Sequence, residues 1–225
     1  MNDTRTETLI IGAGPAGLAA AACLSRRGLP LTLIEGAGQI GEAWHNHYKR
    51  LRLHTARDYS ALPGLPFPVH YPTFPSREQV IEYLDSYAAK FELNPVLGQS
   101  VTRLALDDGT WTAETPDHRF RARRVIVATG MNRVPFQPEW PEQARFGGQV
   151  LHSRAYRDGA PFAGKRALVV GFGNTGAEIA MDLVEHGAAE VSVSIRGPVD
   201  VIPREFRGRP TQVRWNGRRV CVGAA

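Results

Sequence analysis

The sequence lacks the features that mark several classes of protein. Only two of its 225 residues are cysteines, Cys23 and Cys221, and they form no CxxC pair. A disulfide framework, a redox-active dithiol and a cysteine zinc site are therefore disfavoured, which fits a reducing cytosol. The N-terminal apolar stretch has no basic region before it, and glycines and a proline interrupt it early. We expect neither a signal peptide nor a membrane span, and hence a cytoplasmic protein.

The chain also lacks a concentrated basic tract. It has 27 Lys and Arg against 22 Asp and Glu, a formal net charge of +5, but the basic residues are scattered except for Arg121, Arg123, Arg124 and the final segment. A small anionic ligand is therefore expected, and nucleic acid is not. His45 and His47 lack a third ligand or a carboxylate partner in a recognised pattern, so we expect no metal site.

The sequence does contain a dinucleotide-binding pattern at its N-terminus. Two apolar runs flank a glycine-rich turn and an alanine-rich helical stretch. These segments are Thr8–Ile11, Gly12–Gly17, Leu18–Arg26 and Leu31–Ile34. Gly12 permits a tight turn, Gly14 lets backbone N–H groups approach a pyrophosphate, and Gly17 lets helix and strand pack closely. Pro15 and Ala16 complete the turn at the helix N-terminus, where the pyrophosphate is expected.

Glu35 ends the second strand of this pattern. An acidic group at that position accepts hydrogen bonds from ribose hydroxyls. A glycine-rich turn alone would be weak evidence. Strand, glycines, helix, strand and acid in this order favour a bound dinucleotide over a turn without a ligand.

A second fingerprint of the same kind has a different last residue. Its turn residues are Gly171, Gly173, Asn174, Thr175 and Gly176. The flanking segments are Ala167–Val170, Ala177–His186 and Glu190–Ile195. The pattern ends in Arg196, which can bind a 2′-phosphate bidentately and favours NADPH over NADH; the alternative is an exposed strand end. The first pattern ends in an acidic residue, Glu35, and the second in a basic one, Arg196. This difference indicates that FAD binds to the first unit and NADPH to the second.

The segments between the fingerprints complete the predicted fold. Val101–Leu106, Thr110–Thr115 and Phe120–Ala122 are typical of a small antiparallel β-meander. A buried parallel strand follows and ends in the small residues Ala128, Thr129 and Gly130, which would let the backbone pass close to a nucleotide. The fold class is α/β, with two Rossmann-like, doubly wound, three-layer dinucleotide-binding units and this meander. We expect an FAD-binding domain over 1–150 and an incomplete NADPH-binding domain over 151–225.

The region between Gly38 and Pro75 is irregular and rich in aromatic residues and proline. An amphipathic helix, VIEYLDSYAAKF, follows it. We expect its Tyr83, Leu84 and Tyr87 to belong to the core and not to contact a cofactor.

The stretch FGGQVLHSRAY lies between the two fingerprints. It resembles the FxGxxxHxxxY motif of the class B flavin monooxygenases, with Phe146, Gly148, His152 and Tyr156 at its four defined positions. Other segments are similar to bacterial flavin-containing monooxygenases and plant indole-pyruvate monooxygenases. They are Gly41–Trp44, the LPGLPFP tract, Tyr71–Ser76, Val127–Gly130 and Ile202–Glu205.

The resemblance implies an enzyme in which NADPH reduces FAD, O2 adds to the flavin, and a hydroperoxyflavin inserts one oxygen atom into a small organic substrate. The expected reactions are N- or S-oxygenation, or oxidative decarboxylation of an arylpyruvate-type acid. It further implies that Gly41 and Trp44 help to bind the cofactor. His152 would have a gating or positioning role and no acid–base role. The oligomeric state stays open, a homodimer included.

Two departures from the family pattern leave alternatives open. Many members place an asparagine near the flavin in the loop occupied here by Leu53–Thr55, and we find no equivalent residue. The segment from Arg207 onward is rich in arginine and has the character of a truncated or frameshifted tail. A flavin-dependent NADPH reductase and a non-catalytic nucleotide-binding fragment therefore remain as alternatives.

Overall fold

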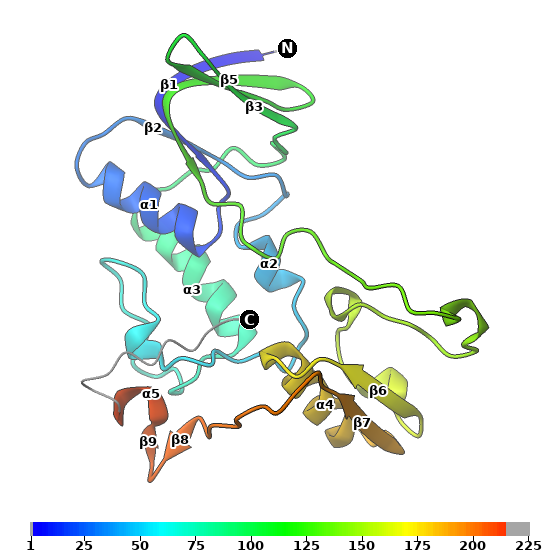
Figure 1. The fold of residues 1–225 in the computed structure, drawn as a ribbon. Coiled ribbons are helices and arrows are strands. Elements are labelled where there is room, and N and C mark those ends of the chain that lie inside the picture. The colour runs from blue at the N-terminus through cyan, green and yellow to red at the C-terminus, as the bar shows by residue number, and fades with distance from the viewer. Residues whose placement is uncertain (1, 215–225) are drawn as a thin grey trace. The chain divides into compact units, whose positions relative to one another are not determined.

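The structure is a computed structural model that describes residues 2–214. The chain forms two compact units, each assembled from separate stretches of sequence (Figure 1). The first unit comprises Met1–His45, Ala61–Val69 and Glu78–Val134, and the second comprises Asn46–Ser60, His70–Arg77 and the chain from Pro135 onward. The stretches 46–60 and 70–77 thus lie in the second unit. The division into an FAD-binding domain over 1–150 and an NADPH-binding domain over 151–225 stays a prediction.

A five-stranded sheet forms the centre of the first unit, in the order β2-β1-β5-β4-β3. Strand β1 pairs in parallel with both β2 and β5, whereas β3, β4 and β5 form an antiparallel meander. The strands are β1 (Asn2–Ile11), β2 (Leu31–Ile34), β3 (Arg103–Asp107), β4 (Thr110–Glu114) and β5 (His118–Val127). The mixed α/β sheet with its meander confirms the predicted fold class.

Strands β1 and β5 are longer than the apolar pattern predicts. They pair from Asn2 opposite His118 to Ile11 opposite Val127, so one strand replaces the two that we expect between residues 120 and 128. The early parts of both strands are polar and carry cross-strand ion pairs. One joins Asp3 to Arg121 at 3.3 Å. Such pairs stabilise a sheet without the alternation of apolar residues that sequence analysis looks for.

The two long helices of the first unit are α1 (Pro15–Ser25) and, apart from its first residue, α3 (Arg77–Lys90). Helix α1 packs on β1 and β2. Tyr83, Leu84 and Tyr87 of α3 are buried, which confirms that they belong to the core. The Tyr83 hydroxyl donates to the Leu65 carbonyl at 2.7 Å, and the Tyr87 hydroxyl donates to the Pro63 carbonyl at 2.8 Å. These bonds hold the proline-rich tract against α3.

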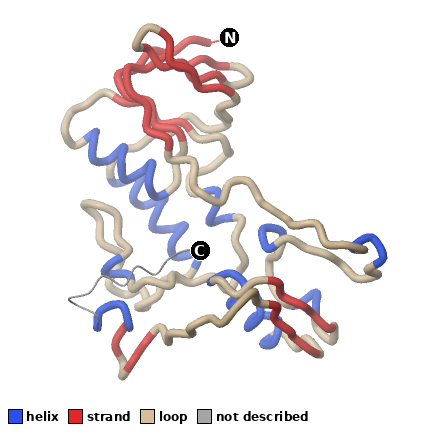
Figure 2. Tube along the Cα trace, viewed as in Figure 1, coloured by secondary structure: helices blue, strands red, loops and turns tan. Residues whose placement is uncertain are grey.

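The second unit contains a strand–helix–strand arrangement that Figure 2 shows in red and blue. Its elements are β6 (Arg166–Val170), α4 (Asn174–Glu185) and β7 (Glu190–Ser194). Strands β6 and β7 are parallel, and α4 packs on both. The short elements of the chain are α2 (Glu42–His45), β8 (Glu205–Phe206), β9 (Arg209–Pro210) and α5 (Thr211–Arg214). Strands β8 and β9 pair as a small antiparallel hairpin.

Candidate functional site

The first glycine-rich turn joins β1 to α1 in a shape that only glycine allows. Gly12 has a φ of +109°, and a Cβ atom there would lie 2.5 Å from the Ala128 carbonyl oxygen. A Cβ atom on Gly17 would lie 1.8 Å from the Gly12 carbonyl oxygen. By contrast, a Cβ atom on Gly14 would meet nothing within 4 Å. Gly12 and Gly17 therefore serve the packing of the turn, and Gly14 leaves open space at the N-terminus of α1.

Glu35 is fixed beside this turn at the end of β2. Its Oε2 accepts a hydrogen bond from the Ala13 N–H at 2.7 Å, and its Oε1 accepts one from the Ala37 N–H at 3.0 Å. The two oxygens of a carboxylate offer about four acceptor positions. Two positions thus remain for hydroxyl donors, and the structure places the predicted ribose partner at the glycine turn.

The other site residues predicted for the first unit lie at different distances from the turn. The Gly41 N–H donates to the Ala13 carbonyl at 3.1 Å, and the Ala128 N–H donates to the Ile11 carbonyl at 2.8 Å. Thr129 and Gly130 continue from Ala128 and are exposed. Trp44 is half-buried on α2, and its N–H donates to the Gly41 carbonyl at 2.8 Å. Gly41 and Ala128 are thus joined to the turn by backbone hydrogen bonds, and Trp44 is bonded to Gly41.

The second glycine-rich turn repeats this geometry between β6 and α4. The Gly171 N–H donates to the Ser194 carbonyl at 2.9 Å, as the Gly12 N–H donates to the Ile34 carbonyl at 2.8 Å. A Cβ atom on Gly176 would lie 2.2 Å from the Gly171 carbonyl oxygen, whereas one on Gly173 would meet nothing within 4 Å. The two turns therefore share one tight glycine contact and one open position.

Asn174 and Thr175 form the first turn of α4, immediately after the open Gly173. Arg196 lies two positions beyond the end of β7 and is exposed. Within residues 2–214 its guanidinium has no hydrogen bond or ion pair. An exposed cation without a carboxylate partner at this place is suited to an anionic ligand.

The residues of the FxGxxxHxxxY motif have separate structural tasks. A Cβ atom on Gly148 would lie 2.6 Å from the Phe146 ring, so a larger residue there would displace that ring. The half-buried His152 begins the helical turn Ser153–Ala155, and its Nδ1 accepts from the Arg154 N–H at 3.1 Å. The neutral imidazole therefore carries its proton on Nε2. Tyr156 is buried, and its hydroxyl donates to the Asp182 carboxylate at 2.6 Å.

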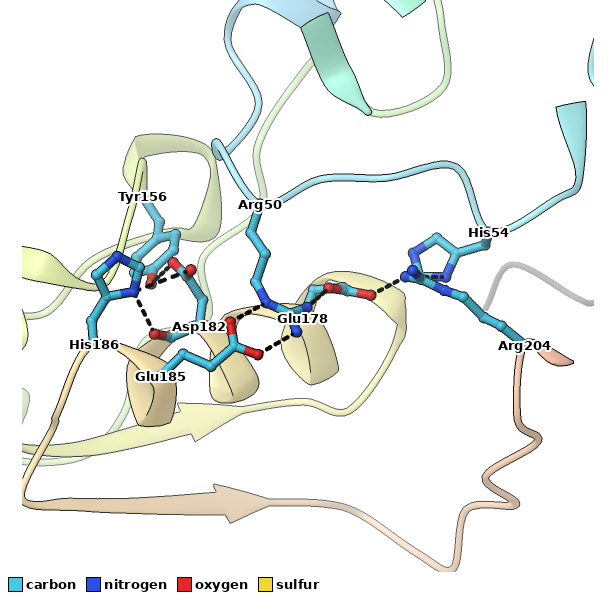
Figure 3. Close-up of polar contacts among 8 residues, drawn as sticks. All are labelled: Arg50, His54, Tyr156, Glu178, Asp182, Glu185, His186 and Arg204. Atoms are coloured by element: carbon cyan, nitrogen blue, oxygen red, sulfur yellow. Dashed lines mark hydrogen bonds and ion pairs between the residues drawn. The ribbon is translucent and has the colours of Figure 1, made fainter. Parts of the chain in front are cut away.

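Helix α4 presents three carboxylates on one face, as Figure 3 shows. We call Glu178, Asp182 and Glu185 the acidic stripe; their spacing of four and then three residues places them on one side of a helix. The Arg50 guanidinium forms an ion pair with Glu178 and a forked pair with Glu185 at 2.9 and 2.7 Å. Arg204 binds the other oxygen of Glu178.

The acidic stripe changes the protonation of its partners. Burial first, and then the hydrogen bond and the charge of Asp182, raise the pKa of Tyr156. The hydrogen bond from Arg50 lowers the pKa of Glu185. At neutral pH the phenol therefore stays protonated and the carboxylate stays ionised. Sequence analysis missed the stripe, although the spacing of its carboxylates in the predicted helix was a readable signal.

The part of the chain that the structure describes contains neither a cluster of metal-ligating side chains nor a membrane-spanning helix. Among residues 2–214, no three His, Cys, Asp or Glu side chains gather into a group that could hold a metal. The helices of the same residues are too short or too polar to cross a bilayer. Cys221 and most of the arginine-rich tail lie outside the described residues.

Comparison with known proteins shows the family. The sequence pattern of the family described as pyridine nucleotide-disulphide oxidoreductase matches residues 9–204, so the chain belongs to this family. It is 43% identical over 207 residues to indole-3-pyruvate monooxygenase YUCCA1 of Oryza sativa subsp. japonica, a match that covers 90% of this chain and 51% of that protein. The chain thus spans about half the length of the curated relatives it matches.

Solved structures of flavin monooxygenases are also similar to this chain. A mutant of the flavin monooxygenase from Stenotrophomonas maltophilia superposes with a TM-score of 0.86 at 28% identity, covering 95% of this chain and 63% of that one. The complex of OTEMO with FAD and NADP gives a TM-score of 0.72 at 26% identity, covering 86% of this chain and 39% of that one. The resemblance to the flavin monooxygenases stated from the sequence is confirmed.

Proposed function

We propose that this chain carries the FAD- and NADPH-binding units of a monooxygenase that inserts one oxygen atom from O2 into a small organic substrate. The observation that carries the proposal is the pair of glycine turns, which share one tight glycine contact and one open position. They differ in the residue that comes after the second strand of each unit. Glu35 comes after β2 in the first unit, whereas Arg196 comes after β7 in the second.

The residues of the first unit fit an FAD molecule. The open position at Gly14 and the N-terminus of α1, with Pro15, Ala16 and Gly17, would receive the pyrophosphate. The two remaining acceptor positions of Glu35 would bind ribose hydroxyls. The flavin, when bound, supplies the redox chemistry that protein side chains lack. The protein's own residues bind it and exclude water.

The residues of the second unit fit NADPH. Gly173 leaves the same open space as Gly14, and the backbone N–H groups of Asn174, Thr175 and Gly176 lie at the N-terminus of α4. Arg196 would bind the 2′-phosphate, for which a second acid like Glu35 would be repulsive. We therefore favour NADPH over NADH.

His152 would act by position and not by proton transfer. Its Nδ1 is engaged by the Arg154 N–H, and Tyr156 anchors the same segment to the acidic stripe. A segment tied down at one end and carrying a half-buried imidazole is suited to gate access to a neighbouring nucleotide. The YUCCA1 relative is named for indole-3-pyruvate, so an arylpyruvate-type acid is the substrate class we propose first.

The proposal is tested on the purified chain by its visible absorption spectrum. FAD is added, free flavin is removed by desalting, and NADPH is added first without and then with O2. We expect retained flavin absorption that NADPH bleaches and O2 restores. Retained flavin that NADPH cannot bleach would contradict the assignment of the second unit, and no retained flavin would contradict that of the first.

A further inference from the structure

The motif segment that carries His152 reaches the interior of the second unit at Tyr156. Among residues 151–157, only Tyr156 is buried. Its hydroxyl donates to Oδ2 of Asp182 at 2.6 Å, and Asp182 is itself 2% exposed. A hydrogen bond to a carboxylate is short and strong because one partner is charged. Tyr156 therefore joins the segment to α4 through a charge-assisted hydrogen bond (Figure 3).

We propose that Asp182 is a positioning residue for His152: by accepting the Tyr156 hydrogen bond, it fixes the helical turn that orients the imidazole. The proposal rests on the proposed function, which assigns a gating role to His152. It extends that function to a carboxylate of the acidic stripe, outside both glycine turns and outside the FxGxxxHxxxY motif.

A continuous set of hydrogen bonds connects Tyr156 to the imidazole. The Tyr156 N–H donates to the Ser153 carbonyl at 3.2 Å, and the Ala155 N–H donates to the His152 carbonyl at 2.9 Å. Within the same turn, the Arg154 N–H donates to His152 Nδ1 at 3.1 Å. The backbone of the turn thus holds the ring, and Tyr156 holds the turn. Displacement of Tyr156 would therefore release the bond at Nδ1.

The Asp182 carboxylate has a defined orientation. His186 Nδ1 lies 2.8 Å from the Asp182 backbone carbonyl, which can only accept, so this Nδ1 carries a hydrogen. The same Nδ1 lies 3.3 Å from Asp182 Oδ1. The backbone of the segment also packs here, since a Cβ atom on Gly159 would lie 2.6 Å from the Asp182 carbonyl oxygen. Oδ1 therefore faces His186, and Oδ2 faces Tyr156.

The helix that carries Asp182 also carries the second glycine turn. Helix α4 begins at Asn174, directly after the open position at Gly173, and Asp182 lies about two helical turns further on. A nucleotide at the N-terminus of α4 and an imidazole positioned from Asp182 would thus share one rigid support. This arrangement suits a side chain that must meet the bound nucleotide in a fixed geometry.

A purely structural Asp182 would stabilise the unit without affecting the imidazole. Loss of stability alone would not alter the tautomer of His152 in the folded chain. It also would not separate the rate of flavin reduction from the affinity for NADP⁺. A positioning role changes both, because the imidazole loses its fixed orientation while the N-terminus of α4 stays intact.

The first measurement is the ring 15N NMR spectrum of His152 in the full chain at about pH 8, where imidazole is neutral. Protonated and unprotonated ring nitrogens give separate signals, and His152→Gln identifies those of His152. We expect an unprotonated Nδ1 and a protonated Nε2 in the unaltered chain, and values averaged over both tautomers in Tyr156→Phe and Asp182→Leu. Asp182→Asn should keep the unaltered spectrum, because its amide oxygen still accepts the phenol hydrogen. Glu185→Gln, in the same stripe but bound to Arg50, should keep it as well.

The second measurement separates binding from reaction in the FAD-loaded chain without O2. Titration calorimetry gives the affinity for NADP⁺, and stopped-flow absorption gives the rate of flavin reduction by NADPH. We expect Tyr156→Phe and Asp182→Leu to lower the reduction rate at saturating NADPH by about tenfold and to change the NADP⁺ affinity by less than about twofold. The double variant should match the single variants, because both remove the same hydrogen bond.

Several results would overturn the proposal. These are an unchanged His152 spectrum in Tyr156→Phe and Asp182→Leu, the same spectral change in Glu185→Gln, or parallel losses of NADP⁺ affinity and reduction rate. If Asp182→Leu does not fold, Tyr156→Phe decides, with Tyr59→Phe at an exposed phenol as its control; an unchanged spectrum then overturns the proposal. If NADPH does not reduce flavin in the unaltered chain, the proposed function is refuted instead, and the positioning role with it.

Discussion

At the scale of single residues, the two units differ most in the side chain just beyond the second strand of each. Glu35 is tied by its two oxygens to the Ala13 and Ala37 N–H groups. Arg196 is exposed and, within residues 2–214, free of side-chain partners. A half-buried acid with fixed oxygens suits hydroxyl donors, whereas a free cation suits a phosphate. We therefore expect selection between nucleotides to depend on one side chain in each unit.

Arg196 should determine the preference for a 2′-phosphate. We expect Arg196→Gln to weaken NADP⁺ binding by roughly tenfold or more, because a charge-assisted pair is lost, and to leave NAD⁺ nearly unchanged. Arg204→Gln is an unsuitable control because Arg204 binds Glu178. Arg166→Gln alters an exposed arginine at the opposite end of the unit's first strand and serves instead. Equal losses for NADP⁺ and NAD⁺ would contradict the role of Arg196.

His54 should make folding stability depend on pH. Burial first, and then the charge of Arg204, lower its pKa from the ordinary value of 6.5. The folded state therefore disfavours the protonated imidazole. The stabilising contribution is present above pH 6.5 and is lost as the pH falls through the lowered pKa.

The prediction is checked by urea unfolding between pH 7.5 and 5.0 at constant ionic strength. We expect the free energy of unfolding of His54→Gln to fall less steeply toward acid than that of the unaltered chain. His70→Gln, at an exposed imidazole, controls for the loss of one histidine. Parallel pH profiles for His54→Gln and the unaltered chain would rule out this contribution.

At the scale of elements, each glycine turn separates a packing task from a binding task. Gly17 and Gly176 allow the helix to approach the preceding turn, whereas Gly14 and Gly173 face open space. Gly14 has a φ of −81°, which alanine adopts without strain. Alanine substitutions can therefore separate the stability of the unit from its affinity for a nucleotide.

We expect Gly17→Ala to lower the free energy of unfolding by about 3 kcal/mol or more, because the added methyl would overlap the Gly12 carbonyl oxygen. Gly14→Ala should cost about 1 kcal/mol or less, since only a helix cap changes, yet it should weaken FAD binding by about tenfold. Urea unfolding and flavin fluorescence titration measure the two effects. A Gly14→Ala variant that binds FAD as the unaltered chain does would contradict the placement of the pyrophosphate.

Several of the helices and strands can be predicted from the sequence because local sequence patterns determine them. The strand–glycine–helix–strand order predicts β2, α1, β6 and α4 close to their observed bounds. The polar half of β1 was missed because its stability comes from pairing with β5 and from contacts such as Asp3–Arg121. The residue pattern within β1 or β5 does not indicate that the two strands pair.

The candidate site likewise contains residues that the sequence predicts and contacts that it does not predict. The glycine positions, Glu35 and Arg196 are predictable from motif spacing. The contact of Arg50 with Glu178 joins residues more than a hundred positions apart. It depends on how the stretch 46–60 folds within the second unit, and nothing in the sequence near Arg50 indicates it. The acidic stripe is an intermediate case. The sequence shows the spacing of its carboxylates but not the side chains that bind them.

At the scale of the whole molecule, the central claim is that one chain holds two different dinucleotides in two units. Each unit has its own glycine turn, its own helix N-terminus and its own final residue after the second strand. If the units are separate sites, each nucleotide should bind in the presence of the other. Gly14→Ala should then impair FAD alone, and Gly173→Ala should impair NADP⁺ alone.

The most direct test is calorimetric titration of the purified chain with FAD in the absence and in the presence of saturating NADP⁺, and then in the reverse order. The account predicts one FAD and one NADP⁺ per chain, with neither ligand reducing the stoichiometry of the other. Competition between the two ligands for one site, or binding of only one of them, would contradict it.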